Sequence, residues 1–305
     1  AVEFYLDEDL GDREAQIGIS IDPDTQTTGQ GAAEGKIYSA YYLRLRDGFR
    51  LGVLAQALDK AGGGAGEKRD LVRELFNDHP PRIVVGGQQR ICTAELKRGD
   101  LFCLPRGLSA AEDFCRLPNG KFAVKWVLLS PAIWPEVRSA EGIFAHSGGW
   151  LPNWVAEAKC QLEGEQVEPG SVLLLDGAGR KKAERQQLPS GKRLPARLVA
   201  AIVPKPIVVT GWALPNDTDR PQGGAKSAHL AVPAGAVYYF EADSAEGAAQ
   251  LAAALNWHGA VTGDPAKDFT TVNHRRSTLL GEKGFGIGLC GTWGFWGAAE
   301  RPGTS

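Results

Sequence analysis

The sequence lacks methionine altogether, even at position 1, although a chain of 305 residues usually carries several. We therefore expect a missing front segment, or methionines that the printed chain has lost. It also lacks any apolar run near the roughly 18 to 20 residues of a membrane-spanning helix, and it shows no signal peptide. The lack of a membrane-spanning run and of a signal peptide predicts a cytoplasmic protein without a membrane partner.

A strong charge of either sign is also missing, since the net charge is −2 and the isoelectric point is near 6.3. No global field therefore attracts nucleic acid, and any polyanion must meet a local basic patch. The most basic window is RKKAERQQLPSGKRLPAR at 180–197. We interpret it either as a solvated loop or as a contact to a phosphate backbone. The first 24 residues are acidic, with Arg13 as their single base, and should not touch RNA directly.

Cysteine and histidine are scarce, with five of each. No C-x-x-C pair occurs and no two histidines lie at ligand spacing, so the sequence predicts neither a metal site nor a cofactor. We expect the cysteines to be reduced thiols. They are Cys92, Cys103, Cys115, Cys160 and Cys290.

Glycine is abundant, and GFGIGLCG at 284–291 contains the spacing G-x-G-x-x-G. A dinucleotide site requires these glycines between a strand and a helix, with an acidic residue about 20 positions later. Here the chain continues as TWGFWG, which is not a helix, and ends at residue 305. The stretch is therefore not a dinucleotide site. A phosphate-binding P-loop and a serine hydrolase elbow are also absent.

The same stretch can instead form a loop that grips single-stranded RNA. Glycine lets the backbone approach a phosphate closely, while a cation and an aromatic ring hold the nucleotide by charge and stacking. A tight turn packed against a partner subunit is the alternative. The candidate residues are His274, Arg275, Arg276, Gly281, Lys283, Gly284, Phe285 and Gly286.

The apolar pattern predicts many strands and few helices. Alternation in YYLRLRDGFRLGV, residues 41–53, predicts a hairpin that turns at Asp47–Gly48. RIVVGGQQRICT should be a strand broken by Gly86–Gly87, and FAVKWVL and ARLVAAI should be strands. Helices are expected in DLVRELFNDH and in SAEGAAQLAAALNWHG, the latter with Ser244 as its N-cap and Gly259 past its end. Short helices among many strands favour an α+β fold over a doubly wound sheet.

Four stretches together resemble one family. They are QIGISIDPDTQTTGQGAAEGKIYSAYYLRLRDG, VKWVLLSPAIW with GGWLPNW, VTGWALPNDTDRPQGGAKSAHLAVPAGAVYYFE, and STLLGEKGFGIGLCGTW. In this order they are similar to the third subunit of the Cmr module, a RAMP protein of type III-B CRISPR effector complexes. The resemblance extends from about Ile17 to Trp293, and AVPAGAVYYFE and the terminal glycine loop are its most specific parts.

The resemblance implies a RAMP fold built of ferredoxin-like, RRM-type antiparallel sheets with glycine-rich loops and insertions. Residues 1–122 would be the remainder of the N-terminal domain, and 123–305 the C-terminal domain. Family members begin with a strand and an Arg-Asp-Gly-Arg-like segment before the matched part, so we expect the opening strand to be missing here. The implied role is that of a non-catalytic subunit. It would bind the 5′ handle of the crRNA and bridge the large polymerase-like subunit to the backbone RAMP subunit.

Residue by residue, VVGGQQR matches the family's glycine-glycine-x-x-arginine turn and places Gly86, Gly87, Gln88 and Arg90 near the handle. Arg44 and Arg46, which alternation puts on one strand face, are further candidates for RNA contact. Two other interpretations stay open. One is a metal-independent RAMP endoribonuclease that matures guides, with His274 as acid or base. The other is a scaffold that contacts subunits and no RNA.

Overall fold

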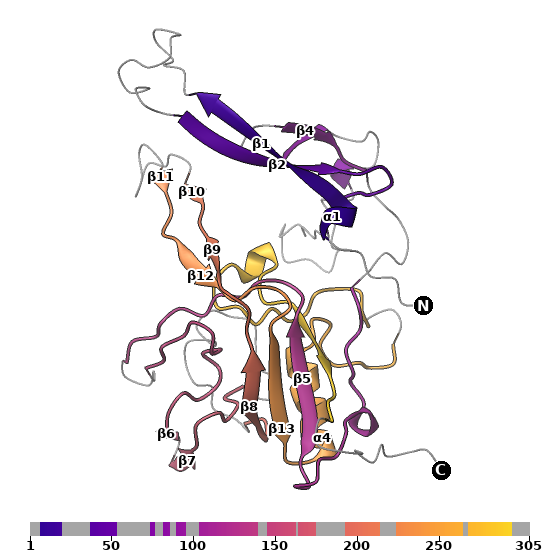
Figure 1. The fold of residues 1–305 in the computed structure, drawn as a ribbon. Helices are drawn as coiled ribbons and strands as arrows, with labels where there is room; N and C mark the ends of the chain where they lie inside the picture. The colour runs from indigo at the N-terminus through magenta and orange to yellow at the C-terminus, as the bar shows by residue number, and fades with distance from the viewer. Residues whose placement is uncertain are drawn as a thin grey trace, which may run out of the picture. The chain divides into compact units, whose positions relative to one another are not determined.

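The structure is a computed structural model that consists of two compact units, residues 1–99 and 100–305 (Figure 1). It describes residues 7–19, 37–53, 74–76, 82–85, 90–95, 104–139, 145–162, 164–174, 193–213, 224–264 and 268–294. The sequence placed the boundary after residue 122 instead. The difference arises because Phe114, Cys115 and Leu117 are buried in the hydrophobic clusters of the second unit.

The first unit contains a long antiparallel ribbon. A short helix, α1 (Asp7–Leu10), leads into β1 (Gly11–Ile19), which pairs with β2 (Ile37–Leu45) along its whole length. The turn predicted at Asp47–Gly48 is confirmed, since the Phe49 N–H donates to the Arg46 carbonyl at 3.1 Å. The hairpin predicted around that turn is wrong, because residues 49–53 form no strand and β2 pairs with β1 instead. Pairing with the nine residues of β1 gives β2 more hydrogen bonds than pairing with the five residues after the turn, 49–53, could give.

A second pair in the first unit joins β3 (Arg82–Val85) to β4 (Arg90–Thr93), with Val85 opposite Arg90. The predicted break of the strand near Gly86–Gly87 is confirmed, although the two glycines themselves lie outside the described residues. Of the helix predicted in DLVRELFNDH, only Glu74 and Leu75 are described as helical. The remainder of that prediction also falls outside the described residues.

The second unit is organised by a four-stranded antiparallel sheet in the order β14-β5-β13-β8. These strands are β5 (Phe122–Leu128), β8 (Ala196–Ile202), β13 (Val237–Ala242) and β14 (Gly288–Gly291). Helix α4 (Ala245–Leu255) connects β13 to β14, which lie on either side of β5. The antiparallel pairing and the few helices are compatible with the predicted α+β class, and they exclude a doubly wound parallel sheet.

Helix α4 forms where the sequence predicted it, because its segment is rich in alanine, the best helix former. The Ser244 hydroxyl oxygen caps the start by accepting the Gly247 N–H at 3.0 Å. The helix ends at Leu255, and Gly259 follows in the left-handed region with φ +75°. Its inner face carries Ala248, Leu251 and Leu255, which are fully buried.

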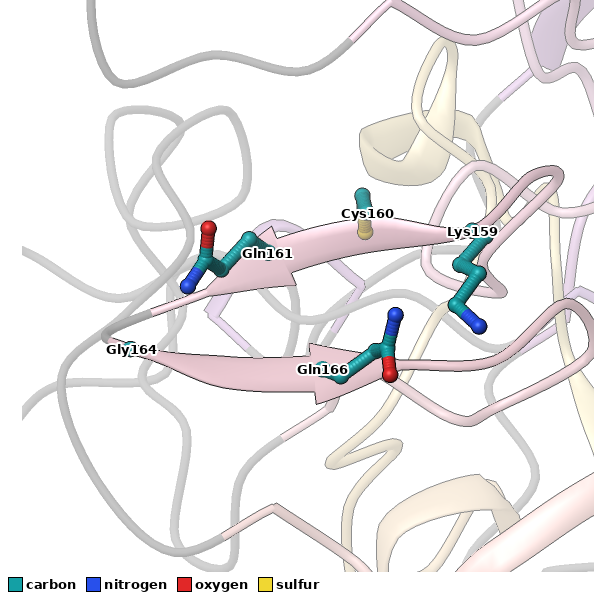
Figure 2. Close-up of a pocket in the computed structure, with 5 residues that line it drawn as sticks. All are labelled: Lys159, Cys160, Gln161, Gly164 and Gln166. Atoms are coloured by element: carbon teal, nitrogen blue, oxygen red, sulfur yellow. The ribbon is translucent and has the colours of Figure 1, made fainter.

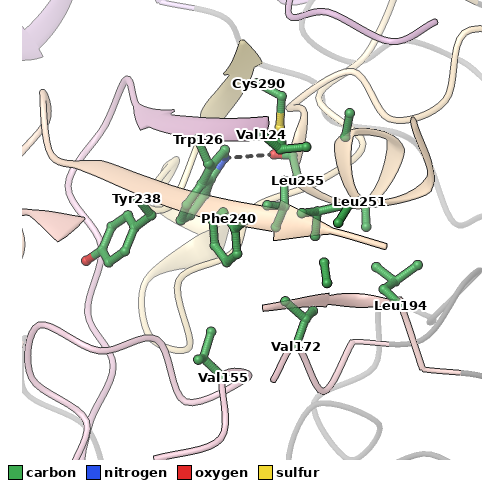
Figure 3. Close-up of a cluster of buried hydrophobic side chains, with 14 of the residues drawn as sticks. Val124, Trp126, Val155, Val172, Leu194, Tyr238, Phe240, Leu251, Leu255 and Cys290 are labelled. Carbon is green, nitrogen blue, oxygen red and sulfur yellow. Dashed lines mark hydrogen bonds between the residues drawn. The ribbon is translucent and has the colours of Figure 1, made fainter. Parts of the chain in front are cut away.

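The core lies between α4 and one face of the sheet (Figure 3). Trp126 of β5 and Tyr238 of β13 pack with ring centroids 5.7 Å apart. The Trp126 indole N–H donates to the Leu255 carbonyl at 3.1 Å, which ties the sheet to the last turn of the helix. Burying each such large side chain contributes about 1.5 to 3 kcal/mol. Among the described residues, the buried hydrophobic side chains all lie in the second unit, from Phe114 to Trp293.

The remaining described elements are short. The 3-10 turns are η2 (Ala111–Asp113) and η3 (Gly281–Lys283). A hairpin joins β6 (Cys160–Leu162) to β7 (Glu165–Val167). After the Pro204-Lys205-Pro206 corner, β9 (Ile207–Val209) pairs with β12 (His229–Ala231), and β10 (Trp212–Ala213) pairs with β11 (Gly224–Ala225). Among the described residues, no helix is long and apolar enough to cross a membrane.

Candidate nucleic-acid interface

The terminal glycine turn, residues 274–287, begins after α4 and returns the chain to strand β14. It contains η3, which is preceded by Leu280 and followed by Gly284, both in the left-handed region with φ 57° and 84°. The Phe285 N–H donates to the Leu280 carbonyl at 3.3 Å and closes the turn. Glu282 and Lys283 are exposed at its tip, while Phe285 is half-buried.

The glycines of this turn differ in what their missing side chains would meet. At Gly286, φ is +78° and a Cβ would lie 2.0 Å from the Ser277 backbone nitrogen. At Gly284, the nearest atom to an added Cβ is the Ile287 Cδ1 at 3.9 Å. Gly286 is therefore required by close packing against the protein's own backbone. Gly284 has only an ordinary van der Waals contact with a side chain at this position, so the protein's own packing does not require a glycine there.

Hydrogen bonds hold the base of the turn against the loop that follows β5. The Gly286 N–H donates to the Pro131 carbonyl at 2.7 Å, and the Arg276 N–H donates to the Gly286 carbonyl at 2.7 Å. The buried Ser277 hydroxyl oxygen accepts the Ile133 N–H at 2.8 Å. The turn is thus a rigid platform that presents its tip outward.

The three basic residues at the start of the turn occupy different environments. The Arg276 guanidinium donates twice to the Ala254 carbonyl, once from Nε at 2.7 Å, and so satisfies a carbonyl in the last turn of α4. A cation is favoured there because the helix dipole makes that end negative. His274 is half-buried, and its N–H donates to the Trp257 carbonyl at 3.0 Å. Arg275, by contrast, is exposed.

The two arginines predicted on one strand face, Arg44 of β2 and Arg46 just after its end, form ion pairs with residues of β1. Arg44 Nε lies 2.8 Å from a Glu14 carboxylate oxygen, and Arg46 lies 3.2 Å from Asp12. Both guanidinium groups remain more than half exposed, so these pairs are weak. The acidic N-terminal segment thus offsets the charge of the two arginines, which weakens the case for them as phosphate ligands.

Other predicted residues have little structural description. Gly86, Gly87 and Gln88 lie outside the described residues, and Arg90 is placed only as the first residue of β4. Most of the basic window 180–197 is likewise outside. Within its described end, Arg193 forms an ion pair with Glu165, and Arg197 Nε donates to the Pro169 carbonyl at 2.9 Å.

An open pocket of about 440 Å³ lies at the β6–β7 hairpin (Figure 2). Its lining contains none of the residues predicted to contact RNA. Burial raises the pKa of the Cys160 thiol, and the nearby Arg193 opposes this only in part. The thiol is therefore neutral and a poor nucleophile at neutral pH. The lining residues are Lys159, Cys160, Gln161, Gly164 and Gln166.

A family model described as CRISPR-associated protein (Cas_Cmr3) matches residues 2–293. The chain belongs to the Cas_Cmr3 family. This membership makes it a CRISPR-associated subunit of a Cmr complex, of the type III-B class that the resemblance implied. No curated protein matches the chain.

Two histidines of the Cas_Cmr3 chain are buried and serve the fold. His146 Nε2 bonds the Val155 carbonyl at 3.0 Å, while its Nδ1 accepts the Gly148 N–H at 2.8 Å. His258 Nε2 accepts the Gly107 N–H at 3.3 Å. Burial holds the pKa of both imidazoles below 6.5, which keeps them neutral. In the part of the chain that the structure describes, no group of three or more His, Cys, Asp or Glu residues could hold a metal ion.

Proposed function

We propose that this Cas_Cmr3 chain is a non-catalytic subunit that binds the 5′ handle of the crRNA. The observation that carries the proposal is the terminal turn, whose base is fixed by hydrogen bonds, while Lys283 is exposed at its tip and the neighbouring Gly284 is not required by the protein's own packing. An unpaired RNA end needs a close approach to backbone and a few cations, not a uniformly basic protein. A net charge of −2 is compatible with this mode of binding.

The sheet of the second unit supports a RAMP fold of the ferredoxin-like kind. If its strands are numbered in chain order, β14-β5-β13-β8 gives the order 4-1-3-2, all antiparallel. Helix α4 connects the third strand to the fourth across the first, as in a split β-α-β unit. The long insertion between β5 and β8 occupies the place of the other helix. We extend the same proposal, as an expectation, to the first unit.

Membership of a family of Cmr-complex subunits also supports a bridging role between the large polymerase-like subunit and the backbone RAMP subunit. The register of the β1–β2 ribbon places Ile17, Tyr41 and Leu43 on one face, and these side chains are 78 %, 74 % and 54 % exposed. A two-stranded ribbon with an exposed apolar face is marginally stable alone. Contact with a partner subunit would bury this face.

Binding measurements with alanine variants test the role in RNA recognition. The proposal predicts that Arg90→Ala and Lys283→Ala lower the affinity for handle-bearing RNA much more than for an unrelated oligonucleotide. Lys205→Ala, which removes the exposed lysine of the Pro-Lys-Pro corner, is the matched control. Equal losses on both RNAs would contradict specific recognition of the handle.

Incubation of the purified chain with repeat RNA in chelator tests the non-catalytic part. We expect intact RNA. A cleavage product that disappears with His274→Ala would instead support a guide-processing endoribonuclease.

A further inference from the structure

Near the C-terminal end of α4, the guanidinium of an exposed arginine lies over an aromatic ring. The Arg106 guanidinium carbon is 4.0 Å from the centroid of the Phe269 ring. Phe269 in turn packs edge-on against the imidazole of His258, with centroids 4.7 Å apart. None of the ion pairs among the described residues involves Arg106. Its charge is therefore not committed to a carboxylate of the described chain.

The backbone on both sides of Arg106 is anchored. The Pro105 carbonyl accepts the Trp257 indole N–H at 2.8 Å, and the Gly107 N–H donates to His258. A Cβ at Gly107 would lie 1.9 Å from the Asn256 side-chain oxygen, so the segment 105–107 packs tightly against the end of α4. Arg106 is consequently held in place before any ligand binds.

The ring beneath Arg106 is also fixed. Phe269 has a positive φ of 60°, a rare conformation for an aromatic residue, and it follows Asp268. The Asp268 carboxylate accepts the backbone N–H groups of Thr262 and Gly263, which holds the pKa of that carboxyl below its usual value. The carboxylate is thus engaged within its own loop.

The arginine and the ring adjoin the basic segment that precedes the glycine turn. The Asn273 side-chain amide donates to the His258 carbonyl at 2.7 Å. A Cβ at Gly259 would lie 3.3 Å from His274 Nε2, so the loop after α4 packs directly on His274. The exposed Arg275 follows. The chain therefore leads from the packing partner of Phe269 directly to the basic segment His274–Arg276, which was predicted to contact RNA.

We propose that the outer face of the Arg106 guanidinium is a stacking platform for one unpaired base of the guide RNA. Guanidinium planes stack on nucleobases, and the N–H edge can hold the adjoining phosphate. Phe269 keeps the plane oriented, so little side-chain entropy is lost when the base stacks. This inference rests on the proposed function, because it names a contact within the same RNA-binding role.

The test compares the affinity of the full chain for handle-bearing guide RNA among Arg106→Lys, Arg106→Ala and wild type. Lysine keeps the charge but loses the plane, so we expect both variants to bind about tenfold more weakly. Arg116→Ala, which removes an exposed arginine elsewhere in the second unit, is the control and should bind as wild type does. Tryptophan fluorescence of each variant verifies that it is folded.

Guide RNAs with an abasic site at each handle position in turn identify the stacked base. At one position, removing the base should make wild type and Arg106→Lys bind equally. Wild-type affinity of Arg106→Lys for the intact guide would overturn the platform, since charge alone would then suffice. Unchanged RNA affinity of Arg106→Ala, with loss of a partner subunit instead, would also overturn it and indicate a protein contact. Failure of the wild-type chain to bind any guide would overturn the proposed function as well.

Discussion

The two left-handed glycines of the terminal turn should respond very differently to alanine. At both positions the positive φ alone costs an alanine about 1 to 2 kcal/mol. At Gly286 the added Cβ would also meet the Ser277 nitrogen at 2.0 Å, so the backbone must shift and the hydrogen bond to Pro131 is disturbed. Overpacking of this kind costs about 1 to 3 kcal/mol more. We therefore expect Gly286→Ala to lower the free energy of unfolding by about 2 to 5 kcal/mol.

Gly284→Ala should cost only the conformational term, about 1 to 2 kcal/mol, because no atom lies closer than 3.9 Å to the added Cβ. Urea unfolding followed by tryptophan fluorescence measures both losses. In the folded proteins, we expect Gly284→Ala to lower the affinity for RNA more than Gly286→Ala does, since a methyl group beside the exposed Lys283 would keep a phosphate away from the main chain. Equal losses of stability for the two variants would refute the assignment of one glycine to packing and the other to RNA.

Three further predictions follow from contacts in the second unit. Arg276→Ala should lower the free energy of unfolding by about 2 kcal/mol, because the helix end loses its charged donor, whereas removal of the exposed Lys205 side chain by Lys205→Ala should change it by less than about 0.5 kcal/mol. Similar losses of the two variants in urea unfolding would contradict this. Burial depresses the pKa of His146 and His258, so the folded chain binds fewer protons than the unfolded one. The contribution of the two neutral histidines to stability is complete above about pH 6.5, the pKa of histidine in the unfolded chain, and is lost as the pH falls from there toward their lowered pKa values in the folded chain. A urea midpoint that stays constant between about pH 7.5 and 5.5 would contradict this pH dependence. Asn256→Ala should cost about 2 to 4 kcal/mol of unfolding free energy, since the buried amide satisfies one backbone donor and one backbone acceptor, and a midpoint equal to that of wild type would refute that role.

The elements that the sequence predicted correctly are those fixed by local chemistry. The strands at 122–128 and 196–202 and the helix over 245–255 follow from apolar pattern, alanine content and a serine cap. The turn at Asp47–Gly48 follows from glycine's tolerance of positive φ. In each case the information lies within about ten residues of the element.

Predictions that depended on distant partners were less successful. Alternation in residues 41–53 indicates a strand but does not name its neighbour, and β2 pairs with the earlier β1 instead. The segment before β5 gave no sign that Phe114, Cys115 and Leu117 would pack into the second unit. Long-range packing set both outcomes.

The candidate site shows the same limit at the level of single residues. Arg275 and Arg276 are adjacent and chemically identical, yet only the tertiary contact to Ala254 shows that Arg276 holds a helix end. Gly284 and Gly286 are likewise equivalent in sequence. The stacking of Arg106 on Phe269 joins residues from distant segments and carries no local motif that could have revealed it.

Crosslinking in the assembled Cmr complex tests the central claim most directly. Guide RNA with a photoreactive nucleotide in its 5′ handle would be irradiated, and the adducts on this chain mapped by mass spectrometry. Our account predicts adducts in peptides that contain the turn from Arg275 to Phe285, and fewer when Lys283 is replaced by alanine. Adducts that map only to other subunits would contradict it.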